Sequence, residues 1–347
     1  MIKAGIIGCG KIAQIRHMPE YQENAHVVLA GFFDRDFERA SALAKEYGGK
    51  AYQTAEDMFA DPEIDAVSIC VANKAHALYT IEALEAGKHV LCEKPMATTI
   101  EDCEAMIKAA EAAGKKLMID QNQRMVRTHR RAKELLNEGL IGKVITFRTT
   151  FGHGGPETWS INPGMASWFF DRKQSGMGAM ADLGVHKTDL IQYLLGENVV
   201  ETTAKVAALE KRDASGNLIG VDDNAMCIYR MKSGILGTMT ASWTYYGAED
   251  NSTILYGDKG IMRIFDDPDC SIKVILRNGE EIDYKVDLIQ TNDNQTSTGI
   301  IDAFVDCILN DTEPEISGQS VLAAMRAVFA SIDASEEGRS ISIEQNM

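Results

Sequence analysis

Hydrophobic and polar residues follow two different rhythms along the chain, and the change between them falls near residue 122. In the first part, short apolar runs alternate with segments in which apolar residues recur every three or four positions. This alternation of strand and helix patterns predicts a parallel sheet that is covered by helices on both faces. The expected strands and helices, in chain order, are 2–7, 11–21, 27–33, 37–47, 54–60, 66–71, 76–86, 89–92, 99–114 and 117–120.

The second part is richer in strands. After a helix expected at 128–138, most segments alternate apolar and polar residues between turn signals such as Asn278-Gly279, which is typical of antiparallel strands. A loop over 152–177, a helix over 180–195 and two closing helices, 300–309 and 319–337, complete this part. The expected strands are 143–151, 202–210, 224–231, 235–244, 253–256, 272–276 and 281–284. We therefore expect two domains, 1–122 and 123–347, with the chain crossing back near its C-terminus.

The first apolar run leads into a glycine-rich turn that suits a dinucleotide. Residues 8–13 read Gly-Cys-Gly-Lys-Ile-Ala, a G-x-G-x-x-A pattern between two predicted strands. The first glycine permits a sharp turn, the second allows a pyrophosphate to approach the backbone, and the alanine lets the helix pack on the strand. The free N–H groups of that helix attract phosphate. We expect cofactor contacts from Gly8, Gly10, Lys11 and Ile12.

A carboxylate after the second strand indicates which cofactor is bound. Asp34 follows Gly10 by 24 residues, near the spacing at which a carboxylate reaches the adenosine ribose hydroxyls. Its charge disfavours a 2′-phosphate and therefore favours NAD. Arg35 weakens this preference, since an adjacent arginine can serve NADP or stack on adenine. The alternative for Asp34 is a capping role at the next helix.

Composition narrows the class of protein. The 347 residues are 45% hydrophobic and carry a formal charge of −16, which makes nucleic acid and anionic membranes poor partners. The sequence has neither a signal-peptide pattern at its start nor an apolar run long enough to span a membrane. Its seven cysteines are scattered and form no C-x-x-C pair. Reduced core thiols in a cytoplasmic protein explain them best.

A second group of residues could carry chemistry. Lys94 directly follows a predicted strand, at the sheet edge where ligands bind in open α/β folds. Asp182 and His186 lie four residues apart and share a helix face, which Asp189 and Tyr193 continue as a polar stripe. These groups suit alcohol oxidation: an imidazole can take the hydroxyl proton and a lysine can stabilise the developing oxygen. Asp182 can hold a neighbouring hydroxyl or orient His186. Metal-ligand spacings are absent, so no metal is expected.

These motifs together resemble the Gfo/Idh/MocA family of glucose–fructose oxidoreductases and inositol dehydrogenases. The resemblance rests on residues 8–13, on Glu93-Lys94-Pro95, on Gln123-Arg124 and on the pattern Gly178-x-x-x-Asp182-x-Gly184-x-His186-x-x-Asp189. The chain departs from the family pattern at Val71-Ala72-Asn73 and Gly176-Met177-Gly178. The resemblance implies an α/β protein with a Rossmann domain and a second domain built on a large, mostly antiparallel open sheet. Through one face of that sheet it implies a homodimer or homotetramer.

The resemblance also implies residue roles. Lys94, Asp182 and His186 form the catalytic set, with His186 as the acid/base, and Asn73, His76 and Glu93 join Lys94 and Arg35 on the cofactor side. For substrate binding we expect Arg124, His153, Trp159 and Trp168 beside Asp182 and His186, although both tryptophans could equally be hydrophobic plugs. Two other histidines have plainer expectations: His17 lies on a helix surface, with an approach to the cofactor as the alternative, and His129 is exposed.

The sequence therefore predicts an NAD-dependent dehydrogenase acting on a secondary hydroxyl of a sugar, a glycoside (C3 favoured) or an inositol. Two alternatives stay open: an NADP-dependent sugar or dihydrodiol reductase, and a non-catalytic NAD(H)-binding regulator. The intact Lys94, Asp182 and His186 set argues against the regulator. The substrate, the carbon oxidised, the physiological direction and any recycling of tightly held NAD are not encoded in these patterns.

Overall fold

The computed structural model describes residues 1–161, 163–287 and 297–344. The chain divides into two compact units. Unit 1 comprises Met1–Asn122 and Asn294–Leu322, and unit 2 comprises Gln123–Asp293 and Ala323–Met347. Among the described residues, no helix has the length and apolar character needed to cross a membrane. All seven cysteines are buried and free of disulfides.

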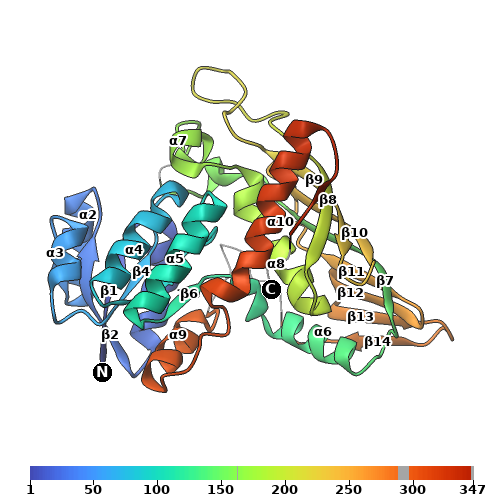
Figure 1. Cartoon of the computed structure of the whole chain (residues 1–347), viewed down its shortest axis with the longest axis horizontal. Coiled ribbons are helices and arrows are strands. Elements are labelled where there is room, and N and C mark those ends of the chain that lie inside the picture. Colours follow the sequence, from blue (N-terminus) through green and yellow to red (C-terminus); the bar gives the residue numbers. More distant parts are fainter. Residues whose placement is uncertain (162, 288–296, 345–347) are drawn as a thin grey trace. The chain divides into compact units, whose positions relative to one another are not determined.

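Unit 1 is built on a parallel sheet whose strand order is β3-β2-β1-β4-β5-β6 (Figure 1). This order reverses direction between β1 and β4, so the adjacent connections diverge there and leave room for a ligand beyond the carboxyl ends of the strands. The apolar runs predicted from the sequence form these strands because both faces of the sheet are covered. The strands are β1 (Ile2–Ile7), β2 (Val27–Phe33), β3 (Lys50–Ala51), β4 (Ala66–Ile69), β5 (His89–Cys92) and β6 (Leu117–Ile119).

The helices of unit 1 begin and end at the expected signals. The side chains of Asp36, Thr54 and Thr99 accept backbone N–H groups at three helix starts, and Gly48 and Gly114 end two helices in the left-handed conformation. The segment after the glycine-rich turn is a π-helical turn, Ala13–His17, that continues into α1 (Met18–Glu23). The other helices are α2 (Phe37–Tyr47), α3 (Ala55–Ala60), α4 (His76–Glu85), α5 (Ile100–Ala113) and α9 (Ile300–Leu309).

Unit 2 is built on a mostly antiparallel sheet of order β14-β13-β12-β11-β7-β10-β9-β8-β15 (Figure 1). One neighbouring pair, β7 with β10, runs parallel. The strands are β7 (Val144–Gly152), β8 (Val199–Ala207), β9 (Asn224–Met231), β10 (Leu236–Ser242), β11 (Thr253–Gly257), β12 (Gly260–Asp267), β13 (Cys270–Leu276), β14 (Glu281–Tyr284) and β15 (Ile341–Ser342).

Helices cover one face of this sheet. Helices α6 (Arg127–Asn137) and α8 (Val185–Leu195) pack together and against the strands. A second π-helical turn, Met180–Gly184, leads into α8, and a short α7 (Arg172–Ser175) lies in the long loop before it. The second half of α10 (Gly318–Glu337) lies along β8, where Ser331 and Ser335 hydrogen-bond to that strand.

Most predicted elements are confirmed, and the differences have local causes. The sequence patterns missed β12, because its acidic end, Phe265-Asp266-Asp267, reads as a loop, yet Met262 and Ile264 are fully buried. They also missed β3, α7 and β15, which are only two to four residues long. The strand predicted at 202–210 ends at Ala207, because the carboxylate of Asp223 takes the N–H groups of the three residues 209–211.

Candidate functional site

In unit 1, the predicted cofactor residues gather at the carboxyl ends of the strands. Gly8 follows β1 with a φ of 91°, and a Cβ there would stand 2.6 Å from the carbonyl oxygen of Cys70. A side chain is therefore excluded at Gly8 by both conformation and space. At Gly10 a Cβ would meet no atom within 4 Å, so the backbone is open to an approaching group. This turn fits a dinucleotide pyrophosphate, which Gly8 to Ile12 would hold through their backbone.

Asp34, directly after β2, is tied to the glycine-rich turn. Its Oδ2 accepts the N–H of Cys9 at 2.8 Å, and its Oδ1 accepts the N–H of Asp36 at 2.8 Å. The residue that caps α2 is Asp36, so the capping alternative for Asp34 is not the one adopted. A basic residue that the sequence reasoning did not single out, Arg39, pairs with Asp34 at 3.2 Å. Arg35 is exposed.

The remaining cofactor-side candidates follow β4 and β5. Asn73 and His76 are buried after β4, and Lys94 is half-buried after β5. The Nδ1 of His76 lies 2.7 Å from the carbonyl oxygen of Pro95, and its Nε2 lies 3.1 Å from that of Val71. His76 therefore joins the loops after the two strands, and burial lowers its pKa. The expectation that His17 lies on a helix surface is wrong, since its side chain is 1% exposed.

In unit 2, a π-helical turn presents the predicted Asp182. Both oxygens of the Asp222 carboxylate accept backbone N–H groups at the start of this turn, from Gly178 at 2.8 Å and from Met180 at 2.7 Å. A Cβ on Gly178 would stand 1.8 Å from the Asp222 carbonyl oxygen. Only glycine fits there, which explains one residue of the sequence motif. Asp182 and His186 are both 6% exposed.

Asp182 lies within a polar and aromatic group. The indole N–H of Trp243 donates to its Oδ2 at 3.0 Å, and the Nε2 of His153 lies 3.9 Å from the same oxygen. Because the Nδ1 of His153 accepts the N–H of Gly155 at 3.0 Å, its ring proton belongs on Nε2, facing Asp182. The Phe151 ring lies 5.9 Å from the ring of His153 and 6.1 Å from that of His186. The structure thus brings together three residues predicted from sequence: Asp182, His153 and His186.

The two predicted tryptophans belong to an aromatic group in the loop before Met180. Trp168 stacks on Phe169 with 3.9 Å between ring centroids, and Trp159 meets the edge of Phe169 at 5.2 Å. Trp159 also lies 6.4 Å from the ring of His153. Both tryptophans are half-buried. They therefore adjoin the group around Asp182 and keep part of their surface accessible.

Arg124 and Asp189 form a buried ion pair with each other. The Arg124 guanidinium donates to both carboxylate oxygens, at 2.7 and 2.5 Å, and both residues are buried. The polar stripe predicted on this helix is thus divided: Asp182 and His186 face the aromatic group, while Asp189 pairs with Arg124. The expectation that His129 is exposed is wrong, because it is 1% exposed and contacts the carbonyl oxygen of Gln123 at 2.8 Å. Burial lowers its pKa to about 3.

Sequence reasoning missed two titratable residues of unit 2 beside this group. Lys187 is fully buried, its Nζ donates to the carbonyl oxygen of Asn251 at 2.8 Å, and burial lowers its pKa to about 7. Burial also raises the pKa of Glu249 to about 7, with Asp182 contributing to the rise. Trp243 was missed as well. Lys187 directly follows His186 in the sequence, but neither a motif nor a spacing marks Glu249, which comes from a loop.

These features define a class. Unit 1 carries a glycine-rich turn and a carboxylate suited to a dinucleotide, and unit 2 carries a buried imidazole and carboxylate suited to proton transfer. The description is that of a dinucleotide-dependent oxidoreductase. Two family models match the chain: "Oxidoreductase family, NAD-binding Rossmann fold" over residues 2–121, and "GFO/IDH/MocA C-terminal domain" over residues 129–263. The chain belongs to the Gfo/Idh/MocA oxidoreductase family.

Individual relatives are consistent with this assignment. The chain is 29% identical to 1,5-anhydro-D-fructose reductase of Ensifer adhaerens over the full length of both proteins. It is 30% identical to D-glucoside 3-dehydrogenase of Escherichia coli over 58% of this chain and 56% of that enzyme. The crystal structure of aldose-aldose oxidoreductase from Caulobacter crescentus, complexed with glycerol, has a TM-score of 0.84 and 27% identity, covering 99% of both chains. The chain is thus an oxidoreductase of a family whose members act on sugars and polyols.

Proposed function

We propose that this protein is a dehydrogenase that oxidises a secondary hydroxyl of a sugar, glycoside or inositol, with C3 of a glycoside favoured. The observation that carries the proposal is the grouping of Asp182, His153 and His186 around Phe151 in unit 2. This group combines a proton acceptor, a carboxylate and apolar surface in one buried place. When bound, NAD supplies the hydride acceptor.

Each catalytic residue has a separate task. His186 takes the proton of the reacting hydroxyl, because imidazole ordinarily titrates near neutral pH and can act as a base there. Lys94 donates a hydrogen bond to the oxygen as it becomes a carbonyl. Asp182, held by the Trp243 indole, accepts a hydrogen bond from a neighbouring hydroxyl and fixes which carbon is presented.

The preference for a glycoside rests on the aromatic residues and on one relative. The apolar faces of a pyranose pack well on indole; Trp159 and Trp168 are both half-buried, and Trp159 lies beside His153. The similarity to a glucoside 3-dehydrogenase supports oxidation at C3. Arg124 is a weaker candidate for substrate binding, since Asp189 already occupies its guanidinium.

NAD is the proposed cofactor, and an NADP-dependent reductase is the second candidate. The Asp34 carboxylate would lie against the adenosine ribose and repel a 2′-phosphate. Arg39 favours the alternative, because it pairs with Asp34 and could turn to a phosphate instead. The similarity to 1,5-anhydro-D-fructose reductase supports a reductase activity.

We also propose that the protein assembles into a homodimer or homotetramer through the sheet of unit 2. Large apolar side chains on β7, β9 and β10 are more than half exposed, and these three strands are neighbours in the sheet. Such a patch is typical of a protein–protein contact. Its members are Ile145, Met226, Ile228 and Leu236.

The direct test mixes the purified protein with NAD or NADP and a panel of inositols, free sugars, glucosides and sugar acids, and follows reduced cofactor. Turnover of glucosides with NAD is expected. The oxidised carbon is found by reducing the product with borodeuteride and locating the deuterium by NMR. Cofactor binding without turnover of any polyol would support the non-catalytic regulator instead.

Substitutions test the assigned roles. His186→Ala should abolish turnover and leave NAD affinity within about twofold, whereas unchanged turnover would contradict the base assignment. His26→Ala removes an exposed histidine of unit 1 and is the matched control. Asp182→Asn keeps an acceptor for the Trp243 indole but removes the charge, so it should reduce kcat without unfolding the protein.

A further inference from the structure

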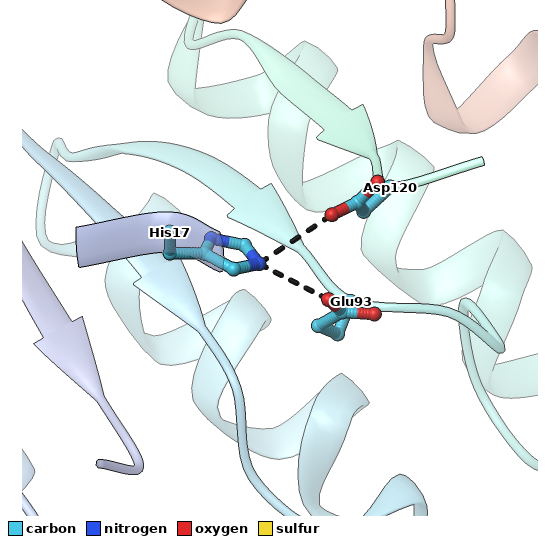
Figure 2. Close-up of side chains that lie close together, drawn as sticks. All are labelled: His17, Glu93 and Asp120. Carbon is cyan, nitrogen blue, oxygen red and sulfur yellow. Dashed lines mark hydrogen bonds and ion pairs between the residues drawn. The ribbon is translucent and has the colours of Figure 1, made fainter. Parts of the chain in front are cut away.

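A buried ionic cluster lies in unit 1, where the π-helical turn that follows the glycine-rich turn meets the residues after β5 and β6. The Nε2 atom of His17 is 3.0 Å from Oε1 of Glu93 and 3.4 Å from Oδ2 of Asp120 (Figure 2). The three residues are 1%, 5% and 1% exposed. A carboxylate only accepts hydrogen bonds, so Nε2 must carry a proton to satisfy either oxygen.

Three separate elements bring the cluster together. Glu93 is the residue after β5 and Asp120 the residue after β6, so both stand at the carboxyl edge of the sheet. His17 is the last residue of the π-helical turn. On its other side, Nδ1 lies 3.1 Å from the hydroxyl of Ser68, which lies 2.9 Å from the hydroxyl of Tyr21. Both nitrogens of the imidazole are therefore held in place.

The second oxygen of Glu93 extends the cluster to Lys94. Oε2 accepts the backbone N–H of Lys94 at 3.1 Å. One carboxylate thus joins the His17 imidazole on one side to the Lys94 backbone on the other. A carboxylate that loses one such partner can rotate about its side chain, and the N–H that it accepts then loses its fixed partner.

The charges around His17 favour its protonated form. Burial opposes the charged imidazolium, but Cys70, Asp120 and Glu93 together raise the pKa of His17 well above its usual range. Burial likewise opposes ionised Glu93, yet the hydrogen bond and charge of His17 lower its pKa to about 2. Burial and the charge of Glu93 raise the pKa of Asp120. The groups acting on the cluster from the neighbouring elements are Arg16, Glu20, Tyr21, Cys70 and Lys94.

We propose that His17 is a positioning residue that, through Glu93, holds Lys94 in the orientation needed for hydride transfer. This inference rests on the proposed function, in which Lys94 contacts the reacting oxygen. It adds a residue outside the expected catalytic set and links the helix after the glycine-rich turn to the Glu93-Lys94-Pro95 segment. His17 itself touches no substrate.

Two measurements test the proposal without requiring catalytic turnover. Nitrogen-15 NMR of the labelled full-length protein should show His17, assigned by comparison with His17→Gln, doubly protonated at pH 8. Amide hydrogen exchange of the peptide containing Lys94 should become about tenfold faster in His17→Gln. His89→Gln is the matched control, because His89 lies at the opposite end of β5 and accepts the N–H of Lys116. A His17 without a proton on Nε2, or equal exchange in both variants, overturns the proposal.

Kinetics then tests whether His17 acts through Lys94. His17→Gln should lower kcat at least tenfold with little change in KM for the polyol, and the double variant with Lys94→Ala should be no slower than Lys94→Ala alone. Equal fractional losses in the wild-type and Lys94→Ala backgrounds would make His17 an independent contributor and overturn the inference. If His17→Gln fails to fold, Ser68→Ala replaces it and should give a smaller loss of the same kind.

The same samples distinguish the proposal from two other interpretations. A wild-type protein that turns over no polyol refutes the proposed function, while the exchange measurement still decides whether His17 orders the Lys94 segment. A stoichiometric zinc ion that survives dialysis and is lost in His17→Gln would make the cluster a metal site. That result would overturn the proposal, because the ion would replace the proton that joins the imidazole to its carboxylates.

Discussion

Replacement of Lys187 by methionine should make unit 2 more stable, by an amount that depends on pH. The ammonium of Lys187 is fully buried, and burial lowers its pKa from the ordinary 10.5 to about 7. That difference corresponds to about 5 kcal/mol between the two protonation states. The hydrogen bond from Lys187 to the carbonyl oxygen of Asn251 offsets about 1–2 kcal/mol of this destabilisation. At pH 7 we therefore expect Lys187→Met to gain about 2–4 kcal/mol.

The sign of the pH dependence follows from proton counting. Between pH 7 and 10.5 the unfolded chain keeps the Lys187 proton and the folded chain releases it. The unfolded state then binds more protons, so wild-type stability should rise with pH by about 1.4 kcal/mol per pH unit relative to the variant. Below pH 7 both states bind the proton and the full penalty applies. The advantage of Lys187→Met should therefore shrink steadily from pH 7 to 9.

Urea unfolding followed by tryptophan emission measures this effect. The three tryptophans, at positions 159, 168 and 243, all belong to unit 2, so the transition reports that unit. Burial raises the pKa of Glu249 to about 7, and repeating the comparison in a Glu249→Gln background removes its contribution. Lys205→Met, at an exposed position of β8, is the matched control. Parallel stability curves for wild type and Lys187→Met between pH 7 and 9 would refute the reasoning.

Three further outcomes are expected. Asp34→Ser should raise kcat/KM for NADP relative to NAD at least tenfold, because the repelling carboxylate is gone and Arg39 keeps only Asp36 of its two carboxylate partners; an unchanged ratio in steady-state assays would contradict this. Gly178→Ala should destabilise unit 2 by about 3 kcal/mol, seen in the same urea transition, because its Cβ would collide with the Asp222 carbonyl oxygen. A thiol reagent should modify none of the seven buried cysteines within minutes in the native protein and all of them in urea; rapid modification of native protein would contradict their burial.

Much of the fold follows from the sequence because the signals are local. The strand at Val27–Phe33 and the helix at Phe37–Tyr47 lie where the patterns predicted them, bounded by Asp36 and Gly48. The Asp182 and His186 spacing likewise placed two residues on neighbouring turns of one helical segment. Such features depend on residues a few positions apart, which a sequence shows directly.

What the sequence could not reveal depends on partners far along the chain. Asp182 is held by Trp243, and Arg124 by Asp189, at sequence separations of 61 and 65 residues. His17 and His129 were misjudged for the same reason. Each lies on a helix with polar neighbours in sequence, yet each is buried by segments that only the tertiary fold brings near. Burial of polar groups by distant elements leaves no periodic trace.

The two π-helical turns have a consequence for comparing this chain with others. A π turn closes with one more residue than an α turn, so it behaves as a one-residue insertion that the helix absorbs without breaking. The first π turn, Ala13–His17, carries His17. The second, Met180–Gly184, carries Asp182 and precedes His186. In a relative that lacks the inserted residue, the surrounding helix would be kept. The side chains on one side of the insertion point would, however, be rotated about the helix axis. The imidazole equivalent to His17 should then be sought one position closer to the glycine-rich turn. The position of the gap in a sequence alignment of this segment therefore decides whether two functional residues are recognised as equivalent.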